Sequence, residues 1–426
     1  MSIELGLAKI TTLLAALGNP HEKLKIVHVG GTNGKGSVCA YISNTLTCAG
    51  YKTGRFNSPH LVAPNDSIRI NEQAISQEVY VQARAAVTQI NAKEGVQASL
   101  FEILTATAFC LFAQEAVQVA VIEVGLGGRL DATNVCSSPL VCVFTSIGLD
   151  HVDLLGDTHA KIAREKAGIM RSGVPVVVGH QANSDAKLVL VEQATALGCP
   201  LELAQPLIKI QDSDDTQLVS ARFAGANIEF QLPLVGDFQL ENSAIALKAL
   251  EFLQHPRAGF ALSPEAVIQG MSTVRWPGRL EWITAPAVGR MVIDGAHNAP
   301  AAIELRRFID NYHRRHPLAP AATTFIFAMT RGKDMASVLS HLLRANDRLV
   351  AVPFSQPEDM PWIHPTLPAD IVALVEERFA SVECEAAADL DSAFQTAGTP
   401  ASQGLVVLCG SLYLVADVYR HLSLPL

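Results

Sequence analysis

The sequence of 426 residues has little charge and no long hydrophobic run. Charged residues make up 17% of the chain and hydrophobic residues 49%, a balance that excludes a disordered protein. No uninterrupted apolar stretch reaches the roughly 18 residues that cross a bilayer. The apolar residues are instead spread over many short segments, which is typical of buried strands and of the inner faces of helices.

Positive charge and paired cysteines are also scarce. The 32 basic and 41 acidic residues leave a formal charge of −9, so we expect no nucleic-acid or membrane partner. The eight cysteines form no CxxC pair and no zinc-type spacing, and we interpret them as reduced thiols of a cytoplasmic protein. The first residues show no signal-peptide pattern. Helical spacing of Ile3, Leu7, Ile10, Leu14 and Leu17 predicts an amphipathic helix rather than a mitochondrial presequence.

Short β-rich runs alternate with helical stretches over most of the chain, which predicts an α/β protein with a mostly parallel sheet. The strands expected in the first part are 25–29, 52–56, 119–124, 140–147 and 174–179. The helices expected there are 36–49, 77–94, 99–115 and 239–253. Between 206 and 233, polar alternating segments around an acidic turn predict a small antiparallel appendage.

The α/β alternation begins afresh after Trp276-Pro277-Gly278-Arg279, which predicts a second, smaller α/β domain of Rossmann-like type. Its expected strands are 291–293, 323–328, 348–354 and 405–409. We therefore divide the chain into a larger first domain, 1–280, and a C-terminal domain, 281–426. Two α/β domains with a cleft between them are typical of an enzyme whose ligands bind at the junction.

The segment from His28 to Ser37 has the composition of a phosphate-binding loop between a strand and a helix. Its glycines let backbone amides turn toward phosphate oxygens, and the helix adds the positive end of its dipole. Lys35 can bridge the β- and γ-phosphates of a nucleotide. The spacing departs from the standard P-loop, because Val29 stands at the first glycine and Gly36 separates Lys35 from Ser37. A glycine-rich turn without a ligand is the alternative.

Two polar residues follow neighbouring buried strands. Glu123 stands near the end of the apolar run 119–124, where a buried carboxylate without a partner would be costly. Mg²⁺ is one partner that fits this position, and an ordinary salt bridge is the alternative. His151 lies just past the next strand and would emerge at the same edge of the sheet, as a metal ligand or as a structural histidine.

Spacing alone says little about a third group of residues. Lys166 has the pattern of an ordinary helix lysine. Asp294 and His297 follow the first strand of the second domain, where polar side chains would face the cleft between the domains. Arg279, in the linker, could reach a nucleotide phosphate.

Together, seven ordered motifs resemble the folylpolyglutamate synthase/dihydrofolate synthase family within the Mur ligase superfamily. The motifs are GTNGKGS (31–37), NSPHL (57–61), EVGLGGRLDATN (123–134), LDH (149–151), EKAGI (165–169), WPGRLE (276–281) and DGAHN (294–298). MPWIH (360–364) and CGSLYL (409–414) are similar, more narrowly, to fungal dihydrofolate synthases. The chain departs from many relatives at 65–70, where NDSIRI stands in place of a run such as ERI near the pterin side.

The resemblance implies roles for residues on both sides of the expected cleft. For ATP it implies Thr32, Asn33, Gly34, Lys35, Gly36, Ser37, Asn242, Arg279 and Asp294. For two Mg²⁺ ions it implies Ser58, Glu123 and His151. It also implies catalytic roles for Lys35, for His297 and for Lys166, which would carry a carbamate that orients the metal shell. For the pterin wall it implies Phe101, Glu102, Leu130, Asp131, Ala132 and Thr133, and Ser411 is a candidate for the glutamate carboxylate.

The activity that the resemblance implies is ATP-dependent ligation of dihydropteroate to L-glutamate through an acyl phosphate, giving dihydrofolate, ADP and phosphate. Extension of reduced folates with further glutamates is the alternative within the family. A P-loop ATPase or a regulatory binding protein is the alternative from another class. We expect a cytoplasmic monomer that acts on small molecules, with a mitochondrial pool left open.

Overall fold

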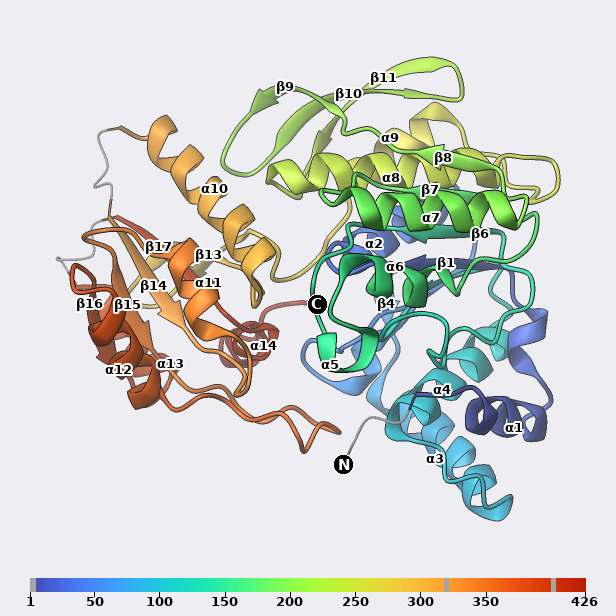
Figure 1. The fold of residues 1–426 in the computed structure, drawn as a ribbon, viewed down its shortest axis with the longest axis horizontal. Coiled ribbons are helices and arrows are strands. Elements are labelled where there is room, and N and C mark those ends of the chain that lie inside the picture. The colour runs from blue at the N-terminus through green and yellow to red at the C-terminus, as the bar shows by residue number, and fades with distance from the viewer. Residues whose placement is uncertain (1–4, 318–321, 400–403) are drawn as a thin grey trace.

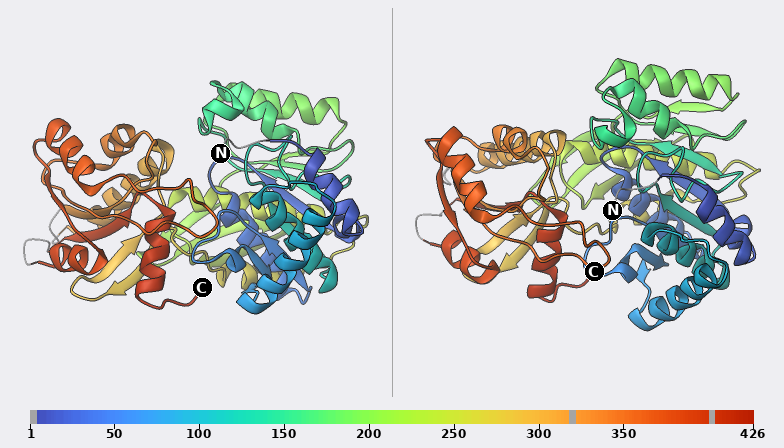
Figure 2. Two further views of the ribbon diagram at one scale, coloured as in Figure 1. Left: turned by 90° about the horizontal axis from the view of Figure 1, so that it is seen from below. Right: turned by 60° about the horizontal axis from the view of Figure 1, so that its bottom comes forward.

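The computed structural model describes residues 5–317, 322–399 and 404–426, which form two large sheets with helices on both faces (Figure 1). The first sheet belongs to the N-terminal part of the chain and the second to the C-terminal part, and the two lie side by side in every view (Figure 2). The predicted first helix is α1, Ala8–Ala16. Ile3, which we placed in that helix, lies outside the described residues.

The first sheet has the strand order β4-β3-β2-β5-β1-β6-β7-β8. Its parallel strands are β1 (Ile26–Gly30), β2 (Thr53–Phe56), β5 (Val119–Glu123), β6 (Val141–Phe144), β7 (Val176–Val178) and β8 (Leu201–Leu203). Two short strands at one edge, β3 (Ile68–Ile70) and β4 (Gln73–Ala74), pair antiparallel. The predicted mostly parallel sheet is therefore confirmed, with an antiparallel edge that the sequence pattern did not indicate.

Successive side chains of β1 enter two different apolar layers, as the period of a strand requires. Val27 and Val29 share a core with α2 (Lys35–Cys48), α8 (Asp237–Leu253) and α9 (Pro264–Ser272). Ile26 belongs to the opposite layer. The helices of that opposite face are α1, α3 (Gln77–Lys93), α4 (Leu100–Gln114), α6 (His159–Ala167) and α7 (Ser184–Ala196). Burial on both faces explains why the strands appear as continuous apolar runs in the sequence.

The predicted antiparallel appendage is confirmed as a three-stranded sheet. Its strands are β9 (Ile208–Asp212), β10 (Gln217–Phe223) and β11 (Ala226–Leu232). Phe223 and Phe230 join the core that contains α9, so one face of this small sheet is covered by the first half of the molecule. The other face carries polar residues of β10 and β11 such as Ser220 and Glu229, which accounts for the alternating pattern there, together with the exposed Ile208 and Ile210 of β9.

The second sheet has the order β12-β13-β17-β14-β15-β16, and β12 alone among these strands runs antiparallel to its neighbour. Its strands are β12 (Glu281–Ala285), β13 (Gly289–Ile293), β14 (Thr323–Phe327), β15 (Arg348–Ala351), β16 (Glu383–Ala386) and β17 (Leu405–Cys409). One face is covered by α10 (Ala299–Arg315), α11 (Met335–Leu342) and α12 (Pro368–Arg378), and the other by α13 (Leu390–Ala397) and α14 (Leu412–His421). Within the described parts of the chain, no helix is long and apolar enough to cross a bilayer.

Polar contacts join the two halves at separate places. At the tip of the appendage, Asp214 accepts hydrogen bonds from Arg315 and from His316 Nε2, the latter at 2.9 Å. On another side, Arg84 of α3 forms an ion pair of 2.8 Å with Asp359. The long connection after β15 thus reaches back to the first half.

The central strand β1 carries a buried histidine that makes the stability of the fold depend on pH. His28 Nε2 is 2.9 Å from the hydroxyl of Thr133, and burial lowers the pKa of His28 to about 3, with Arg171 acting in the same direction. Between that value and the ordinary pKa near 6.5, the unfolded chain binds a proton that the folded chain excludes. Stability from this residue is therefore present above about pH 6.5 and is lost as the pH falls.

We predict that His28→Gln makes unfolding less sensitive to acid. At pH 5 the His28 contribution to the free energy of unfolding should be about 2 kcal/mol smaller than at pH 8. Urea unfolding of wild type and variant at both pH values measures the difference. If the free energy of unfolding falls by the same amount between pH 8 and pH 5 in wild type and variant, His28 does not couple folding to proton binding.

Candidate active site

A cavity of about 630 Å³ lies between the two halves. Segments that follow β1, β5 and β6 form one side of it, and the segment that follows β13 forms another. This is the edge of an open α/β sheet at which ligands bind. All the residues predicted for ATP and metal line the cavity: Thr32, Asn33, Gly34, Lys35, Gly36, Ser37, Ser58, Glu123, His151, Asn242, Arg279 and Asp294. His297, predicted as catalytic, lines it too.

Two glycines shape the loop between β1 and α2. Gly34 has a φ of +91°, and a Cβ there would overlap the side-chain amide of Asn242. Gly36 lies against the indole of Trp276, where a Cβ would overlap the ring. The loop can therefore approach α8 and the linker closely only because these positions lack side chains.

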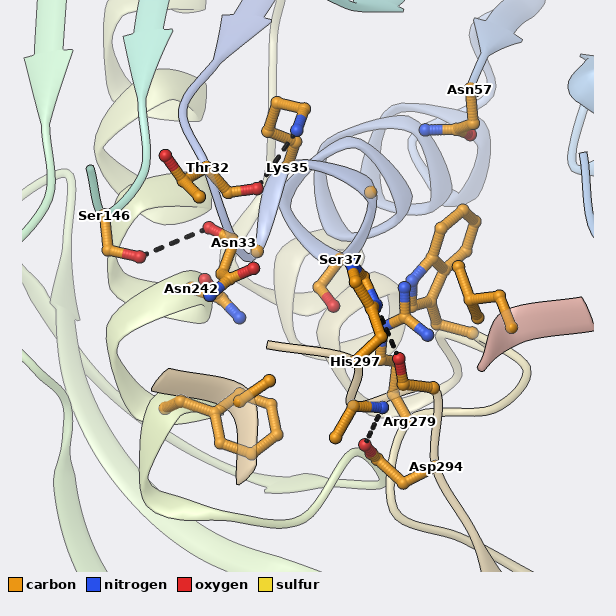
Figure 3. A pocket seen from close by; sticks show the side chains of 18 of the residues that line it. Thr32, Asn33, Lys35, Ser37, Asn57, Ser146, Asn242, Arg279, Asp294 and His297 are labelled. Carbon is orange, nitrogen blue, oxygen red and sulfur yellow. Dashed lines mark hydrogen bonds between the residues drawn. The ribbon is translucent and has the colours of Figure 1, made fainter. Parts of the chain in front are cut away.

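Hydrogen bonds hold the rest of the loop in place. The Thr32 N–H donates to the carbonyl of Ser146 at 2.8 Å, and Lys35 Nζ donates to the carbonyl of Thr32 at 3.1 Å. Figure 3 shows Asn33 beside Ser146, whose hydroxyl donates to the Asn33 carbonyl, with Asn242 on the same side of the cavity. Helix α2 begins at Lys35, so its free N–H groups face the place where a phosphate would bind.

Glu123 is the buried acid of the cavity, with 6% of its surface exposed. Its Oε2 accepts a hydrogen bond from Asn57 Nδ2 at 2.8 Å, and its Oε1 is 3.8 Å from Lys35 Nζ. Burial raises the pKa of this carboxyl, while Lys35, Asn57 and the Ser58 N–H oppose the rise. A buried carboxylate is stabilised by a close ion pair, whereas the ion pair between Glu123 and Lys35 is loose.

The donor set around Glu123 suits Mg²⁺. The described residues contain no group of three or more His, Cys, Asp and Glu that could enclose a metal. Mg²⁺ does not need such a cage, because it keeps several waters and takes one or two carboxylates together with substrate phosphates. Glu123 and the nearby Ser58 offer oxygen donors beside the phosphate loop, and His151 lines the same cavity.

Lys166 lies behind the phosphate loop rather than in the wall of the cavity. Its Nζ donates to the carbonyl of Gly31 at 2.7 Å, and the residue is 6% exposed. Burial lowers the pKa of Lys166 to about 7, and Lys35 acts in the same direction. A substantial share of neutral amine is therefore present at physiological pH. Lys166 also contributes to lowering the pKa of His151, after burial and together with Lys333 and Lys35.

The second half contributes Asp294 and His297 from the loop after β13 (Figure 3). The Asp294 oxygens accept the N–H groups of Leu280 and Ala296, each at 2.8 Å, so this carboxylate fastens the linker to the loop. His297 Nδ1 donates to the Gly295 carbonyl at 2.8 Å, which leaves Nε2 free of the proton. Burial lowers the pKa of His297 to about 4.

An amide pair links this loop to the phosphate loop across the cavity. Asn298 Nδ2 donates to Asn33 Oδ1 at 3.2 Å, and Asn33 Nδ2 lies 3.4 Å from Asn298 Oδ1. On the same side, Lys333 Nζ is 3.3 Å from an oxygen of Asp150. These contacts join the two halves beside the predicted ATP site.

The residues predicted for the substrate lie outside the lining of this cavity: Phe101, Glu102, Leu130, Asp131, Ala132, Thr133 and Ser411. Several have structural partners. Glu102 belongs to the capping box of α4, and its oxygens accept the N–H groups of Ser99 and Ile10. Phe101 fills the space beside Gly125, which does line the cavity. Their assignment to the pterin stays a prediction.

Two further predicted substrate residues shape loops. Asp131 is 2% exposed, and its carboxylate accepts the N–H of Leu126 at 2.7 Å and the hydroxyl of Thr133. Ser411 caps the N-terminus of α14 by accepting the Tyr413 N–H at 3.1 Å. The hydroxyl of Ser411 thus already serves the helix.

Sequence reasoning did not single out several residues that line the cavity, namely His60, Asp66, Ser67, Arg69 and Asp150. His60 and Asp150 stood within quoted motifs, and Asp66, Ser67 and Arg69 stood within the run 65–70 that departs from many relatives, so a signal existed for all five. Arg69 lies in β3, which is second from the edge of the first sheet and too short for a recognisable pattern, and Ser67 directly precedes it. Only the pairing of β3 with β2 brings them to the cavity.

We predict that Gly36→Ala weakens binding of an ATP analogue. The new methyl group meets the Trp276 ring, and such overpacking costs about 1–3 kcal/mol, or about tenfold or more in affinity. Titration calorimetry with a non-hydrolysable ATP analogue measures the change. Gly6→Ala is the matched control, because nothing lies within 4 Å of a Cβ at that position. Equal affinities of the two variants would contradict the assigned role of the loop.

Comparison with known proteins gives a consistent family. The model of the Mur ligase middle domain matches residues 29–250, and that of the dihydrofolate synthetase C-terminal domain matches residues 284–421. A probable dihydrofolate synthetase of Schizosaccharomyces pombe is 39% identical over 100% of both chains. Dihydrofolate synthetase of Saccharomyces cerevisiae is 37% identical over 99% of this chain and 98% of its own.

A solved structure extends this likeness to the fold. Mycobacterium tuberculosis folylpolyglutamate synthase, complexed with ADP and AMPPCP, superimposes with a TM-score of 0.84 at 29% identity. The match covers 99% of this chain and 96% of the other. The chain belongs to the dihydrofolate synthase/folylpolyglutamate synthase family of Mur ligases.

Proposed function

We propose that this protein is an ATP-dependent ligase that joins dihydropteroate to L-glutamate, giving dihydrofolate, ADP and phosphate. The observation that carries the proposal is the cavity in which the phosphate loop, the buried Glu123 and the loop of Asp294 and His297 meet. A nucleotide-switch protein would need only the first of these. The full-length likeness to two fungal dihydrofolate synthetases supports dihydropteroate as the acceptor.

The division of labour follows the two sheets. We propose that residues 1–280 bind ATP and activate the acceptor carboxylate, and that 281–426 present glutamate. The linker that ends at Leu280 is fastened to Asp294, so movement of the second half would be passed directly to the loop of His297. We further propose that the enzyme acts as a monomer in the cytoplasm.

Lys35 and the amides of the phosphate loop hold the transferring phosphoryl group. A carboxylate does not condense with an amine at neutral pH, so ATP must first convert it to an acyl phosphate. Charge on the phosphoryl oxygens grows during transfer, and the N-terminus of α2 with Lys35 stabilises it electrostatically. Mg²⁺, held by Ser58, Glu123 and His151, would supply a Lewis acid for the phosphate and acceptor oxygens.

We propose that Lys166 is converted to a carbamate. Its neutral amine adds CO2 and releases a proton, and the pKa near 7 supplies the neutral form at physiological pH. The carbamate is an anion, which would replace the repulsion between Lys166 and Lys35 by attraction. That change of sign gives the site the negative charge that two divalent ions require.

His297 would position the amine of glutamate rather than remove its proton. Its Nε2 carries no proton, so it can accept a hydrogen bond from the nucleophile. A group with a pKa of about 4 is too weak a base to deprotonate an ammonium ion efficiently. Closure of the two halves through the Asn33–Asn298 pair would exclude water, which would otherwise hydrolyse the acyl phosphate.

The alternative is the addition of glutamates to reduced folates by the same chemistry. The likeness to a folylpolyglutamate synthase of solved structure supports this second activity. Labelled L-glutamate, ATP and Mg²⁺ with either dihydropteroate or tetrahydrofolate separate the two. We expect labelled dihydrofolate from the first mixture. Product from tetrahydrofolate alone would overturn the choice of dihydropteroate.

We predict that Lys35→Ala lowers kcat by about a hundredfold or more, because it removes charge stabilisation of the phosphoryl group. The variant should unfold at the same temperature as the wild type, since Lys35 makes one hydrogen bond within its own loop and one loose ion pair. Initial rates and a thermal melt measure both quantities. Near-normal turnover would contradict the phosphate role.

We predict that Lys166→Ala is inactive and that short-chain carboxylates partly restore its turnover. The added carboxylate would take the place of the carbamate anion. The matched control is Lys161→Ala. Lys161 lies on the same helix as Lys166, and its ion pair with Asp157 is exposed. Activity of Lys166→Ala without any carboxylate would count against carbamylation.

A further inference from the structure

One end of the cavity, formed by residues 57–69, contains buried polar atoms without a protein partner. Within the described residues, the Ser67 hydroxyl and His60 Nε2 make no hydrogen bond. Ser67 is 1% exposed and His60 is 3% exposed, and both line the cavity. A buried hydroxyl or ring nitrogen without a partner costs free energy, so a ligand that bonds them would recover it.

Arg69 adds a positive charge to the same end. It is 9% exposed and lines the cavity, and its Nη1 donates to the backbone carbonyl of Glu72 at 2.9 Å. The Glu72 carboxylate forms an ion pair of 2.9 Å with the guanidinium of Arg55. Across the described chain, no carboxylate lies within 4.0 Å of the Arg69 guanidinium as an ion-pair partner.

Asp66, an acid in the same part of the cavity wall, is already bonded to the backbone. It accepts the N–H groups of Leu61, Val62 and Ala63, at 2.6–3.0 Å, and so its oxygens serve the turn before β3. Burial lowers the pKa of Arg69 and Arg55 lowers it further, while Glu72 and Asp66 act in the opposite direction. A guanidinium in this setting favours an incoming anion, and its planar fork fits a carboxylate.

This end of the cavity adjoins the reaction centre. The Asn57 N–H donates to the carbonyl of Ser67 at 3.0 Å, and the side chain of Asn57 donates to Glu123. Leu412 at the start of α14 lines the same cavity, so the second half also contributes to its wall.

We propose that Ser67 and Arg69, with His60 beside them, bind a carboxylate of the incoming L-glutamate. This assignment rests on the proposed ligase function. The phosphates of ATP belong to the loop at Lys35, and the single carboxylate of dihydropteroate must lie at Glu123 to be activated. Ser411, the residue predicted for a glutamate carboxylate, lies outside the cavity lining and caps α14, so the carboxylates of glutamate still lack a partner in the cavity. The amine would point from Arg69 toward the activated acceptor.

Ser67→Ala is the sharpest test, because the hydroxyl has no protein hydrogen bond to lose. We expect KM for L-glutamate to rise about tenfold and KM for ATP and kcat to stay within twofold. Ser43→Ala is the matched control, since the Ser43 hydroxyl is equally buried and unpartnered but lies outside the cavity lining. Its KM for L-glutamate should not change.

Arg69→Met and Arg69→Lys test the charge. The Met variant should raise KM for L-glutamate about a hundredfold, and Lys should recover part of the loss. L-Glutamine and L-isoglutamine, each with one carboxylate replaced by an amide, identify the carboxylate concerned. Wild type and Arg69→Met should use one of these two amides equally well. The carboxylate that this amide lacks is the one that Arg69 binds in L-glutamate. Unchanged KM for L-glutamate in Ser67→Ala and Arg69→Met, or a rise confined to ATP or the pterin, would overturn the proposal.

A direct measurement of L-glutamate binding distinguishes failure of the carboxylate site from failure of the proposed ligase function. If the enzyme uses neither dihydropteroate nor tetrahydrofolate, the proposed function fails. Equilibrium dialysis of labelled L-glutamate, with a non-hydrolysable ATP analogue and Mg²⁺ present, then decides the carboxylate site alone. Retention by the wild type and its loss in Arg69→Met support the site, and no difference between the two proteins overturns it.

Discussion

The burial of one carboxylate, Glu123, is the constraint on which the site depends. Parallel pairing of β5 with β1 places Glu123 opposite Val29, directly before the phosphate loop. Because burial disfavours the charged form, the surroundings must supply positive charge, and Lys35 at 3.8 Å supplies only part of it. The structure therefore favours a divalent cation at this position, and such a cation would also bind the phosphates of a nucleotide. An acidic chain can bind ATP because cationic and backbone donors are concentrated here.

The second half contributes to this site through side chains that are hydrogen-bonded to backbone groups. Asp294 does not face the cavity as a free acid, since its oxygens fasten Leu280 and Ala296. This arrangement makes the linker and the loop of His297 a single unit. The Asn33–Asn298 pair then joins that unit to the phosphate loop. These contacts are the basis of our proposal that closure of the halves also completes the site.

Much of the fold follows from sequence periodicity, and the exceptions share a cause. Central strands such as β5 are buried on both faces and appear as apolar runs, so their positions were predictable. β3, β12 and β16 are short or partly exposed at sheet edges, where polar residues hide the pattern. Glu102 lies in a capping box that the spacing Ser99 to Glu102 already indicated, and its assignment to the pterin stays a prediction.

The sequence by itself determined the phosphate loop, the order of the motifs and the two-part α/β organisation, because these depend on local spacing. It also indicated Glu123 and His297, since each follows a recognisable strand. Only the tertiary structure decided which polar groups remain without partners. The pairing of β3 with β2 brings Arg69 to the cavity, and the bonds of Arg55 to Glu72 leave Arg69 without a carboxylate. Such a balance of charge depends on contacts between distant segments, which no local pattern encodes.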